Sequence, residues 1–519
     1  MHDLIEKYRH WIVGIFFALY LLAGLLIFKD YGVHWDEYHN QEFGERWSGY
    51  IQQVLQTGSL AIPISHTRYH DLTHGPFLEI CLTLLKDSLH VTDSREIILM
   101  RHLSIFLLYF MGAVIFYFLC LRHFNNWKLA LLGVVLLILN PRTFSHSFYN
   151  TVDIGFLIFF TLAMFTLILF LDKKTWGHAT LHALTCAIAV NIRFFGVPIV
   201  LLTAAALLMG NRHENKQEKE IGLKLLVYYL CLFALLWILF CPILWNDPCG
   251  EIGLIAKTAI TDERFNSVFY LGHMFKLHAL PWHYAPVWIL ISTPVVTSLL
   301  FIAGCIKIIK TFIHKNLEGI DNKRNSALFL LWFLVPLLLA NGRLYNSWRH
   351  IFFIYPALVI IATMGFQYIW VSAKNRRLRS ALIALLLINM LFVLGFMIKN
   401  HPYEDVYFNR LAGKDLGSAK ANFEFSYWGN PYKQALEYIL ARDQSTSIPV
   451  YFYDAEPGQS NLLFLSNPDR NRFVVTDDPL NAKYSIALYK KPKDKPPEQE
   501  CYSIKVNGSK IISIFQKVN

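Results

Sequence analysis

The residues with the clearest chemical potential are carboxylates close to the ends of long apolar runs. His34-Trp35-Asp36-Glu37 follows the first such run, and Asp153 begins a later one. A carboxylate beside an aromatic ring and partly shielded from water can act as a general base toward a hydroxyl. The Asp36-Glu37 pair is therefore a candidate for a general base. Two plainer interpretations stay open: an ordinary polar loop at Asp36, and a helix-dipole partner at Asp153.

Basic residues form the second candidate group. Arg193 and Trp348-Arg349-His350 stand at the ends of apolar runs. An arginine buried at such a position needs an anionic partner such as a phosphate or a carboxylate. The alternatives are snorkelling to lipid headgroups or pairing with a structural acid. Together with the acids, these residues predict an anionic lipid substrate.

Histidines provide a third and weaker signal. His66, His70 and His74 follow one another at i, i+4 spacing, which would place three imidazoles on one face of a helix, as a metal site can require. Pro63 and Pro76 bracket this stretch and argue against a long helix. We therefore expect the cluster to line a polar cleft. No cofactor is expected to be required, and a divalent metal is kept only as an alternative.

The composition defines the environment of these residues. Of 519 residues, 55% are hydrophobic and 16% are charged, and the mean hydropathy is +0.36, which is too apolar for a soluble protein of this size. The net charge of +11 is spread over short loops without a nucleic-acid-binding motif, and the eight cysteines show no paired spacing. There is also no P-loop, GxGxxG or GxSxG motif, which argues against a cytosolic nucleotide substrate. The chain is predicted to be an integral membrane protein surrounded by lipids.

Apolar runs predict about eleven membrane-spanning helices. If the N-terminus is cytoplasmic, every inner loop carries Lys or Arg, as the positive-inside rule expects. This topology places Asp36, Asp153, Arg193 and Arg349 on the same, outer side. The expected spans are 11–28, 97–120, 128–140, 152–171, 178–192, 194–210, 224–245, 284–306, 326–341, 350–372 and 380–398.

The outer side also receives the long segments. These are loops 29–96 and 246–283 and a small α/β domain over 399–519, so that residues 1–398 form the membrane domain. The pattern in 399–519 predicts a helix at 431–442 and strands at 448–453, 473–476, 484–488 and 511–515. The Lys/Pro-rich stretch 490–497 is expected to join two strands. Nothing in this domain resembles an active site. Outer aromatic residues such as Tyr345 suit either an interface belt or stacking on a sugar.

Several short motifs resemble the GT-C class of glycosyltransferases, which use lipid-carrier-linked sugars and include protein O-mannosyltransferases and lipid A aminoarabinose transferases. The resemblance covers about residues 10–400. It rests on Trp35-Asp36-Glu37, His74-Gly75-Pro76-Phe77, Asn140-Pro141 followed by Asp153, Asn191-Ile192-Arg193, and Trp348-Arg349-His350 leading to Tyr355-Pro356.

The resemblance implies roles for these residues. Asp36 would activate an acceptor hydroxyl, and the donor would be a sugar on a polyprenyl phosphate, with inversion at the anomeric carbon. Arg193, Arg349 and His350 would stabilise the leaving phosphate. The other predicted substrate-binding residues are Glu37 and Asp153, which would hold hydroxyls or a cation, together with His74 and Tyr345. The acceptor is an unidentified lipid, glycan or protein hydroxyl, and a bacterial inner membrane is the expected location.

Three other interpretations compete with this one. A lipid-linked glycan flippase or transporter would also be polytopic, but its charges should lie near the bilayer midplane rather than at one interface. A glycan ligase or polymerase would share the scaffold and transfer larger units. A noncatalytic scaffold would tolerate replacement of Asp36.

Overall fold

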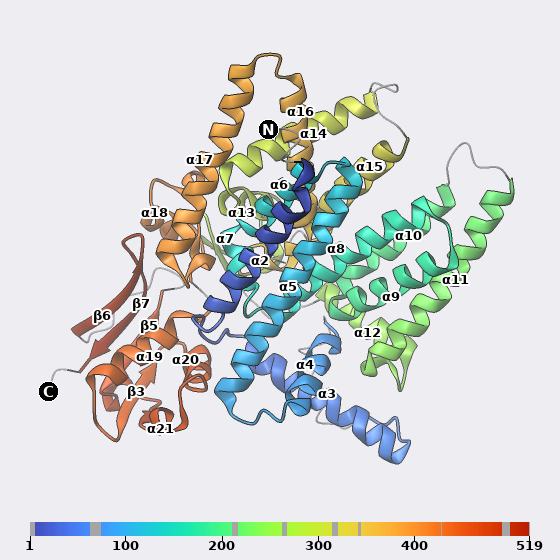
Figure 1. Ribbon diagram of the computed structural model, residues 1–519. Coiled ribbons are helices and arrows are strands. Elements are labelled where there is room, and N and C mark those ends of the chain that lie inside the picture. The colour runs from blue at the N-terminus through green and yellow to red at the C-terminus, as the bar shows by residue number, and fades with distance from the viewer. Residues whose placement is uncertain are drawn as a thin grey trace.

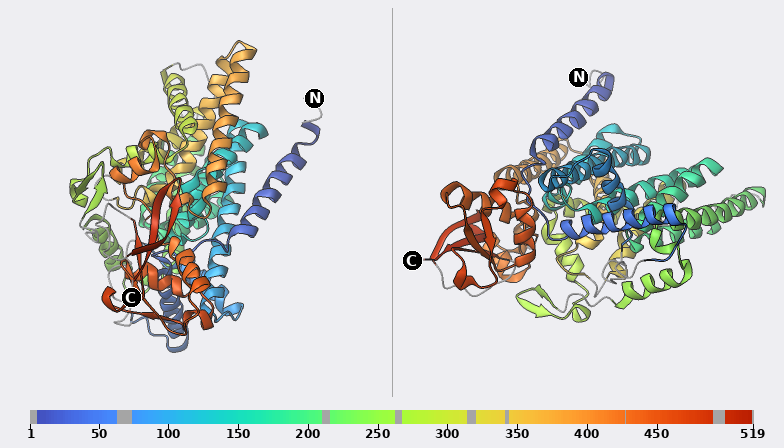
Figure 2. Two further views of the ribbon diagram at one scale, coloured as in Figure 1. Left: turned by 90° about the vertical axis from the view of Figure 1, so that its left-hand side faces the viewer. Right: turned by 90° about the horizontal axis from the view of Figure 1, so that it is seen from below.

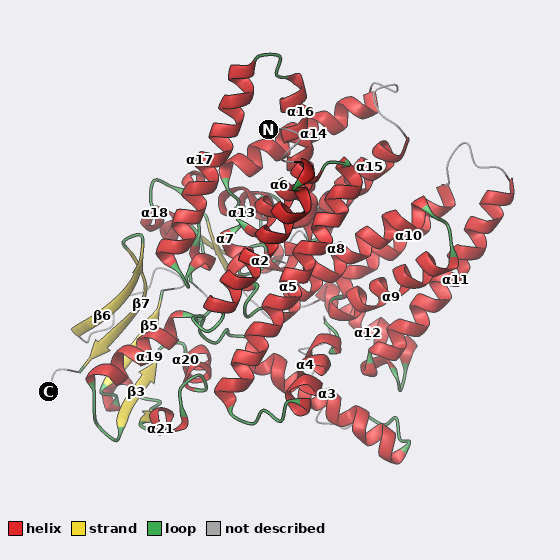
Figure 3. Cartoon of the chain, viewed as in Figure 1, coloured by secondary structure: helices red, strands yellow, loops and turns green. Residues whose placement is uncertain are grey.

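The computed structural model describes residues 6–62, 74–209, 216–261, 267–313, 320–340, 344–426, 428–489 and 499–517. It is a helical bundle with a small α/β domain at one side (Figures 1 and 3). Within the described residues, seven helices are long and apolar enough to cross a membrane. These are α2 (Arg9–Ile27), α5 (Ser94–Phe124), α8 (Thr151–Asp172), α11 (Lys216–Phe240), α14 (Val295–Ile313), η6 with α16 (Arg349–Ser372) and α17 (Arg376–Asn400).

The other predicted spans also correspond to helices. They are α6 (Trp127–Ile138), α9 (Trp176–Ile192), η3 (Phe194–Gly196) with α10 (Val197–Met209), α13 (Tyr284–Ser292) before α14, and α15 (Ile320–Leu339). The span expected at 284–306 is divided between α13 and α14, with Pro294 between them. Proline lacks the backbone N–H that a continuous helix would need there. Each predicted span thus contains a helix, but among the described residues seven helices rather than eleven are long and apolar enough to cross a membrane.

Burial divides the bundle into a centre and a periphery. Most side chains of α8 and α16 are buried, whereas most of those on α2 and α17 are exposed. An apolar helix that exposes its side chains is stable only in lipid. In the two further views, α2 stands apart from the central helices along part of its length (Figure 2). The fold is therefore that of an integral membrane protein.

One end of the bundle carries the larger connections, and we call it the loop-rich face. It holds α3 (Glu37–Thr57), α4 (Phe77–Ser88), η4 (Pro242–Leu244), α12 (Pro248–Thr261) and the hairpin β1 (Val268–Tyr270) and β2 (His273–Phe275). Figure 1 shows α3 and α4 at the bottom, with the N-terminus at the other end of the bundle. The shorter elements are α7 (Pro141–His146), η5 (Leu277–Ala279), η7 (Glu404–Val406), η8 (Arg410–Ala412) and α18 (Leu416–Asn422).

The C-terminal α/β domain contains the predicted helix α19 (Pro431–Arg442) and a five-stranded sheet in the order β4-β3-β5-β7-β6. β3 (Ile448–Phe452) pairs in parallel with β4 (Phe473–Val475) and β5 (Tyr484–Leu488), and β7 (Ser509–Gln516) is antiparallel to β5 and β6 (Gln499–Val506). Sequence patterning found four of these strands and missed β6, in which half of the side chains are exposed. It also missed α20 (Ala455–Leu462), α21 (Asn467–Arg470) and η9 (Pro479–Asn481). The stretch expected to join two strands, 490–497, lies outside the described residues.

Candidate active site

Four charged residues from distant parts of the chain meet at the loop-rich face. Arg349 Nη1 lies 3.0 Å from Asp36 Oδ2 and 3.5 Å from Asp153 Oδ2. Arg193 pairs with the other oxygen of Asp153. We call these four residues the ionic array. The array alternates acid, base, acid, base, so its members neutralise one another in a partly buried position, where an unpaired charge would be costly.

Local sequence sets the position of Asp153. Asn150 precedes α8, and its Oδ1 accepts the backbone N–H of Asp153 at 3.0 Å, which caps the helix. The Asn150 amide also donates to Asp153 Oδ2 at 2.8 Å. Asp153 therefore stands in the first turn of α8, where the helix dipole favours an anion. The expected dipole partner and the candidate site residue are one and the same.

Arg193 is held by contact between two of the motifs identified in the sequence. The backbone N–H of Gly75 donates to the Asn191 carbonyl at 2.6 Å, and that of Phe77 donates to Asn191 Oδ1 at 3.1 Å. A Cβ on Gly75 would lie 2.5 Å from the Asn191 carbonyl oxygen, so only glycine permits this approach. Asn191 also donates to the Phe240 carbonyl at 2.7 Å. These bonds fix the end of α9, where Arg193 is the C-cap residue.

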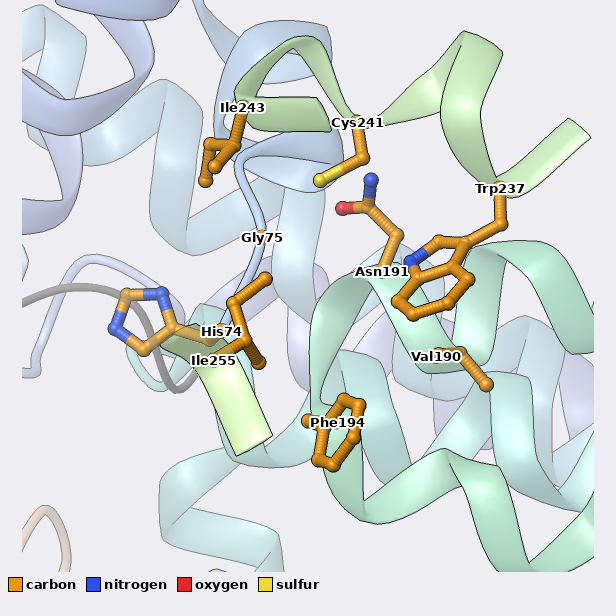
Figure 4. A pocket seen from close by; sticks show the side chains of 9 residues that line it. All are labelled: His74, Gly75, Val190, Asn191, Phe194, Trp237, Cys241, Ile243 and Ile255. Carbon is orange, nitrogen blue, oxygen red and sulfur yellow. The ribbon is translucent and has the colours of Figure 1, made fainter. Parts of the chain in front are cut away.

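A pocket adjoins this contact (Figure 4). His74, Gly75 and Asn191 line it together with the apolar residues Val190, Phe194, Trp237, Cys241, Ile243 and Ile255. His74 also packs edge-on against Phe43, with ring centroids 5.4 Å apart. The structure thus places His74 in a largely apolar pocket near the end of α9. It is not among the residues of the ionic array.

Asp36 and Glu37 are neighbours in sequence, but they face different surroundings. The Asp36 side chain is 41% exposed, so an incoming hydroxyl can reach its carboxylate from the solvent. Glu37 is buried, accepts the backbone N–H of His34 at 3.1 Å and lies 3.0 Å from His102 Nε2. Asp36 is therefore placed to meet a substrate, whereas Glu37 is engaged within the protein.

Aromatic rings surround Arg349. Its guanidinium lies 4.4 Å from the centroid of Trp428 and 5.4 Å from that of Tyr345. Tyr345 in turn contacts His350, with ring centroids 4.4 Å apart. Tyr345 thus lies beside Arg349, and His350 lies beside Tyr345. Trp428 was not assigned to the site, because it lies in the C-terminal domain and nothing in its local pattern indicates a contact with Arg349.

Sequence reasoning also missed a second buried ion pair. Arg101 Nη2 lies 2.6 Å from Glu79 Oε2, and both side chains are buried. Thr151 donates to Glu79 and accepts from Asn40 at 3.2 Å. This pair ties α4 and α5 to the start of α8. No local signal indicated this pair, because Glu79 falls in the predicted loop 29–96 and Arg101 in the predicted span 97–120.

Two histidines near the array are shifted toward the neutral form. Burial, together with the positive charge of Arg349, lowers the pKa of His34 well below its usual value. The same causes act on His146, where Arg142 adds to them and again lowers the pKa. His34 Nδ1 accepts the backbone N–H of Asp36 at 3.0 Å, and His146 Nε2 accepts the indole N–H of Trp428 at 3.0 Å. Neutral imidazoles thus serve as hydrogen-bond acceptors around the array.

The predicted histidine cluster cannot be placed as a whole, because His66 and His70 lie outside the described residues. Elsewhere in the described part of the chain, no group of three or more His, Cys, Asp or Glu side chains is arranged to share a metal ion.

Comparison with known proteins places this geometry in context. The sequence model of the dolichyl-phosphate-mannose-protein mannosyltransferase family matches residues 11–246. No curated protein sequence matches the chain. Solved structures with a similar fold include the following two. Archaeal oligosaccharyltransferase AglB from Archaeoglobus fulgidus, in complex with an inhibitory peptide and a dolichol-phosphate, is 11% identical with a TM-score of 0.52, over 93% of this chain and 70% of AglB. ArnT from Cupriavidus metallidurans, bound to undecaprenyl phosphate, is 10% identical with a TM-score of 0.50, over 97% of this chain and 98% of ArnT.

The matched region 11–246 contains Asp36, Asp153 and Arg193, three of the four residues of the array. The fold shared with AglB and ArnT extends over almost the whole chain, including Arg349. The protein is therefore a membrane glycosyltransferase with the GT-C fold. The resemblance inferred from the motifs is confirmed at this level.

Proposed function

We propose that the enzyme moves a sugar from a polyprenyl-phosphate carrier to an acceptor hydroxyl at the outer face of a bacterial inner membrane. The observation that carries this proposal is the ionic array at the loop-rich face. In it the half-exposed carboxylate of Asp36 pairs with Arg349, and Asp153 links Arg349 to Arg193. A base and a phosphate-binding pair are the groups that such a transfer needs. The structures of ArnT with undecaprenyl phosphate and of AglB with a dolichol-phosphate support a lipid phosphate as the carrier.

The array suggests how binding and catalysis are coupled. In the structure, Arg349 bridges Asp36 and Asp153. A donor phosphate competes for Arg349, because a phosphate accepts several charge-assisted hydrogen bonds from a guanidinium. The ion pair between Arg349 and Asp36 then weakens, and the Asp36 carboxylate becomes available to the acceptor. Donor binding in this way prepares the base.

The transfer step balances as follows. The acceptor oxygen forms a bond to the anomeric carbon while the bond from that carbon to the phosphate oxygen breaks. Asp36 takes the acceptor proton, and the polyprenyl phosphate leaves with its charge stabilised by Arg349 and Arg193. Attack opposite the leaving phosphate inverts the anomeric centre. Asp153 stays between the two arginines and holds them in place.

The charge distribution supports the proposed orientation. The opposite end of the bundle carries Lys173 and Lys174 after α8, Arg122 at the end of α5, and Arg376 and Arg377 at the start of α17. Lys and Arg of short loops favour the cytoplasmic side. The loop-rich face then lies outside, which nucleotide sugars do not reach and a lipid-linked donor does.

The test is transfer of labelled sugar from purified polyprenyl-phosphate sugars to a cell-envelope extract. We expect Asp36→Asn to lower transfer by roughly 100-fold or more, as is typical when a general base is removed. Arg349→Ala should abolish detectable transfer, because it removes the phosphate partner and leaves Asp153 with one arginine. Each variant is compared with and without EDTA, and we propose that EDTA leaves wild-type transfer unchanged.

The same experiment decides between the proposal and its rivals. Labelled product identifies the acceptor as a lipid, a glycan or a protein, and its size separates the transfer of one sugar from that of a whole glycan. Wild-type activity in Asp36→Asn would refute the assignment of the base. Absence of transfer from every donor, together with movement of the donor across vesicles, would favour the flippase.

A further inference from the structure

The C-terminal domain contacts the segment that carries the catalytic base. This segment, residues 29–39, connects α2 to α3 and contains Asp36. The contacts come from three parts of the C-terminal domain, namely 428–433, Glu456 and Asn461. The domain thus reaches the site from one side, while the membrane helices supply the arginines.

Trp428 provides the contact closest to the array. Its carbonyl accepts the backbone N–H of Trp35 at 3.0 Å, directly beside Asp36. Its indole N–H donates to His146 Nε2 at 3.0 Å, which fixes the orientation of the ring. The guanidinium of Arg349 lies 4.4 Å from the ring centroid. One buried side chain therefore restrains both the base segment and the arginine that pairs with the base.

Asn461 provides the second contact and is fully buried. Its Oδ1 accepts the backbone N–H of Val33 at 2.9 Å, and its Nδ2 lies 2.9 Å from the Val33 carbonyl. The same Nδ2 also donates to the carbonyls of Pro457 at 2.7 Å and Gly429 at 3.3 Å. This amide therefore links the base segment to the backbone of the C-terminal domain on both sides of α19.

Two further contacts hold the ends of the segment. Lys433 Nζ donates to the Lys29 carbonyl at 2.6 Å and to the Asp30 carbonyl at 3.2 Å, and His39 pairs with Glu456. Gly32 lies so close to the domain that a Cβ there would be 2.4 Å from the Asn430 carbonyl oxygen. The segment is thus clamped along its length, although it belongs to the membrane domain by sequence.

We propose that Trp428 and Asn461 are positioning residues, through which the C-terminal domain holds Asp36 and Arg349 in the arrangement that transfer requires. This inference rests on the proposed function. It gives the domain a role in catalysis rather than that of an appendage, and neither residue needs to touch the substrate. Misplacement of a reacting group by about 1 Å can cost on the order of 100-fold in rate, so modest motion of the base segment is enough.

The test uses the full-length protein in lipid nanodiscs, with Trp428→Leu, Trp428→Phe and Asn461→Leu. We expect Trp428→Leu and Asn461→Leu to lower kcat by roughly 10- to 100-fold, with KM for the polyprenyl-phosphate sugar within about twofold of wild type. Trp428→Phe should recover part of the lost kcat, because the aromatic face is restored without the indole N–H. Matched controls are Trp282→Leu and Asn481→Leu, at exposed positions that are not part of the array. Both should keep wild-type kcat.

Hydrogen–deuterium exchange over residues 30–40 gives a readout that does not depend on turnover. Faster exchange there in Trp428→Leu and Asn461→Leu, with unchanged exchange in α8, supports the clamp. Wild-type kcat in Trp428→Leu and Asn461→Leu would overturn the positioning role and leave the proposed function intact, as would a fall in kcat that Trp428→Phe does not relieve. If the wild type transfers no sugar from any donor, the proposed function fails, and unchanged exchange over 30–40 would overturn the clamp as well.

Discussion

The two ends of α8 carry similar ionic clusters in different surroundings. At its start, Asp153 lies between Arg193 and Arg349, and at its end Asp172 lies between Arg122 and Arg324. The Asp153 side chain is 1% exposed and that of Asp172 15%. Arg349 and Arg193 are 6% and 13% exposed, against 42% for Arg122. The same residue types are thus desolvated at one end of the helix and partly hydrated at the other.

The helix dipole sharpens this contrast. A carboxylate at a helix start is favoured by the dipole, whereas one at a helix end is disfavoured. Asp172 therefore needs its two arginines to offset the unfavourable helix dipole, and this structural role is enough to explain its cluster. Asp153 is already stabilised by the dipole and by Asn150, so its two buried arginines exceed what stability requires. We interpret that excess as the phosphate-binding function of the loop-rich face.

The strongest test of this comparison replaces the aspartate at each end of α8 by asparagine, so that a neutral amide takes the place of the carboxylate. Asp153→Asn should lower kcat/KM for sugar transfer by about 100-fold, equivalent to roughly 2.7 kcal/mol, because both arginines lose their shared anion. Asp172→Asn is the control and should stay within about threefold of wild type. Equal losses in the two variants would mean that both clusters are structural.

Two glycines give a test of stability: Gly75, which packs against the C-terminal end of α9, and Gly177, which lies in the first turn of α9. Gly75→Ala should lower the free energy of unfolding by about 1–3 kcal/mol, because its Cβ would meet the Asn191 carbonyl oxygen at 2.5 Å. Gly177, at the other end of α9, has open space for a Cβ, and Gly177→Ala should be neutral or slightly stabilising. Thermal unfolding in detergent compares the two. A neutral Gly75→Ala would show that the contact between the two motifs can relax.

Arginine-to-lysine exchange separates charge from geometry. Arg193→Lys should reduce kcat/KM by roughly tenfold, because lysine keeps the charge but loses the planar set of donors that can bind Asp153 and a phosphate together. Arg122→Lys at the opposite end should change transfer by less than about twofold, since its partner is partly hydrated. Full activity in Arg193→Lys would indicate that charge alone suffices there.

The smallest expected effect concerns pH. Burial and Arg349 lower the pKa of His34 and His146 in the folded protein, whereas the unfolded chain titrates near about 6.5. Below the pKa of the unfolded chain, the unfolded state therefore binds more protons than the folded state. The stability that these two histidines contribute is present above this pKa and is lost as the pH falls below it. The melting temperature should drop by a few degrees between about pH 7.5 and about pH 5.5.

Single substitutions assign this pH effect to one face. His146→Gln should reduce the drop on acidification, because one buried imidazole no longer resists protonation. His178→Gln, at the exposed start of α9, should leave the drop unchanged. An equal drop in wild type and His146→Gln would remove His146 as its source.

Much of the fold could be predicted from sequence, because lipid imposes a strong local rule. Each apolar run must become a helix when no water is present to satisfy its backbone, so the spans from α2 to α17 follow directly from hydropathy. The candidates Asp36, Asp153, Arg193 and Arg349 stood out for a related reason. Charges at the ends of apolar runs are costly, and chemistry or pairing must explain them.

The sequence by itself thus determined a polytopic membrane protein with its candidate charges at one interface. Only the tertiary structure decided which of them touch. It joined Arg349 to Asp36 and Asp153, turned Glu37 inward to His102, and brought Trp428 and Asn461 of the C-terminal domain against the base segment. These pairs are separated by tens to hundreds of residues, and side-chain contacts at that distance depend on how the helices pack. Local propensity and hydropathy contain no information about that packing.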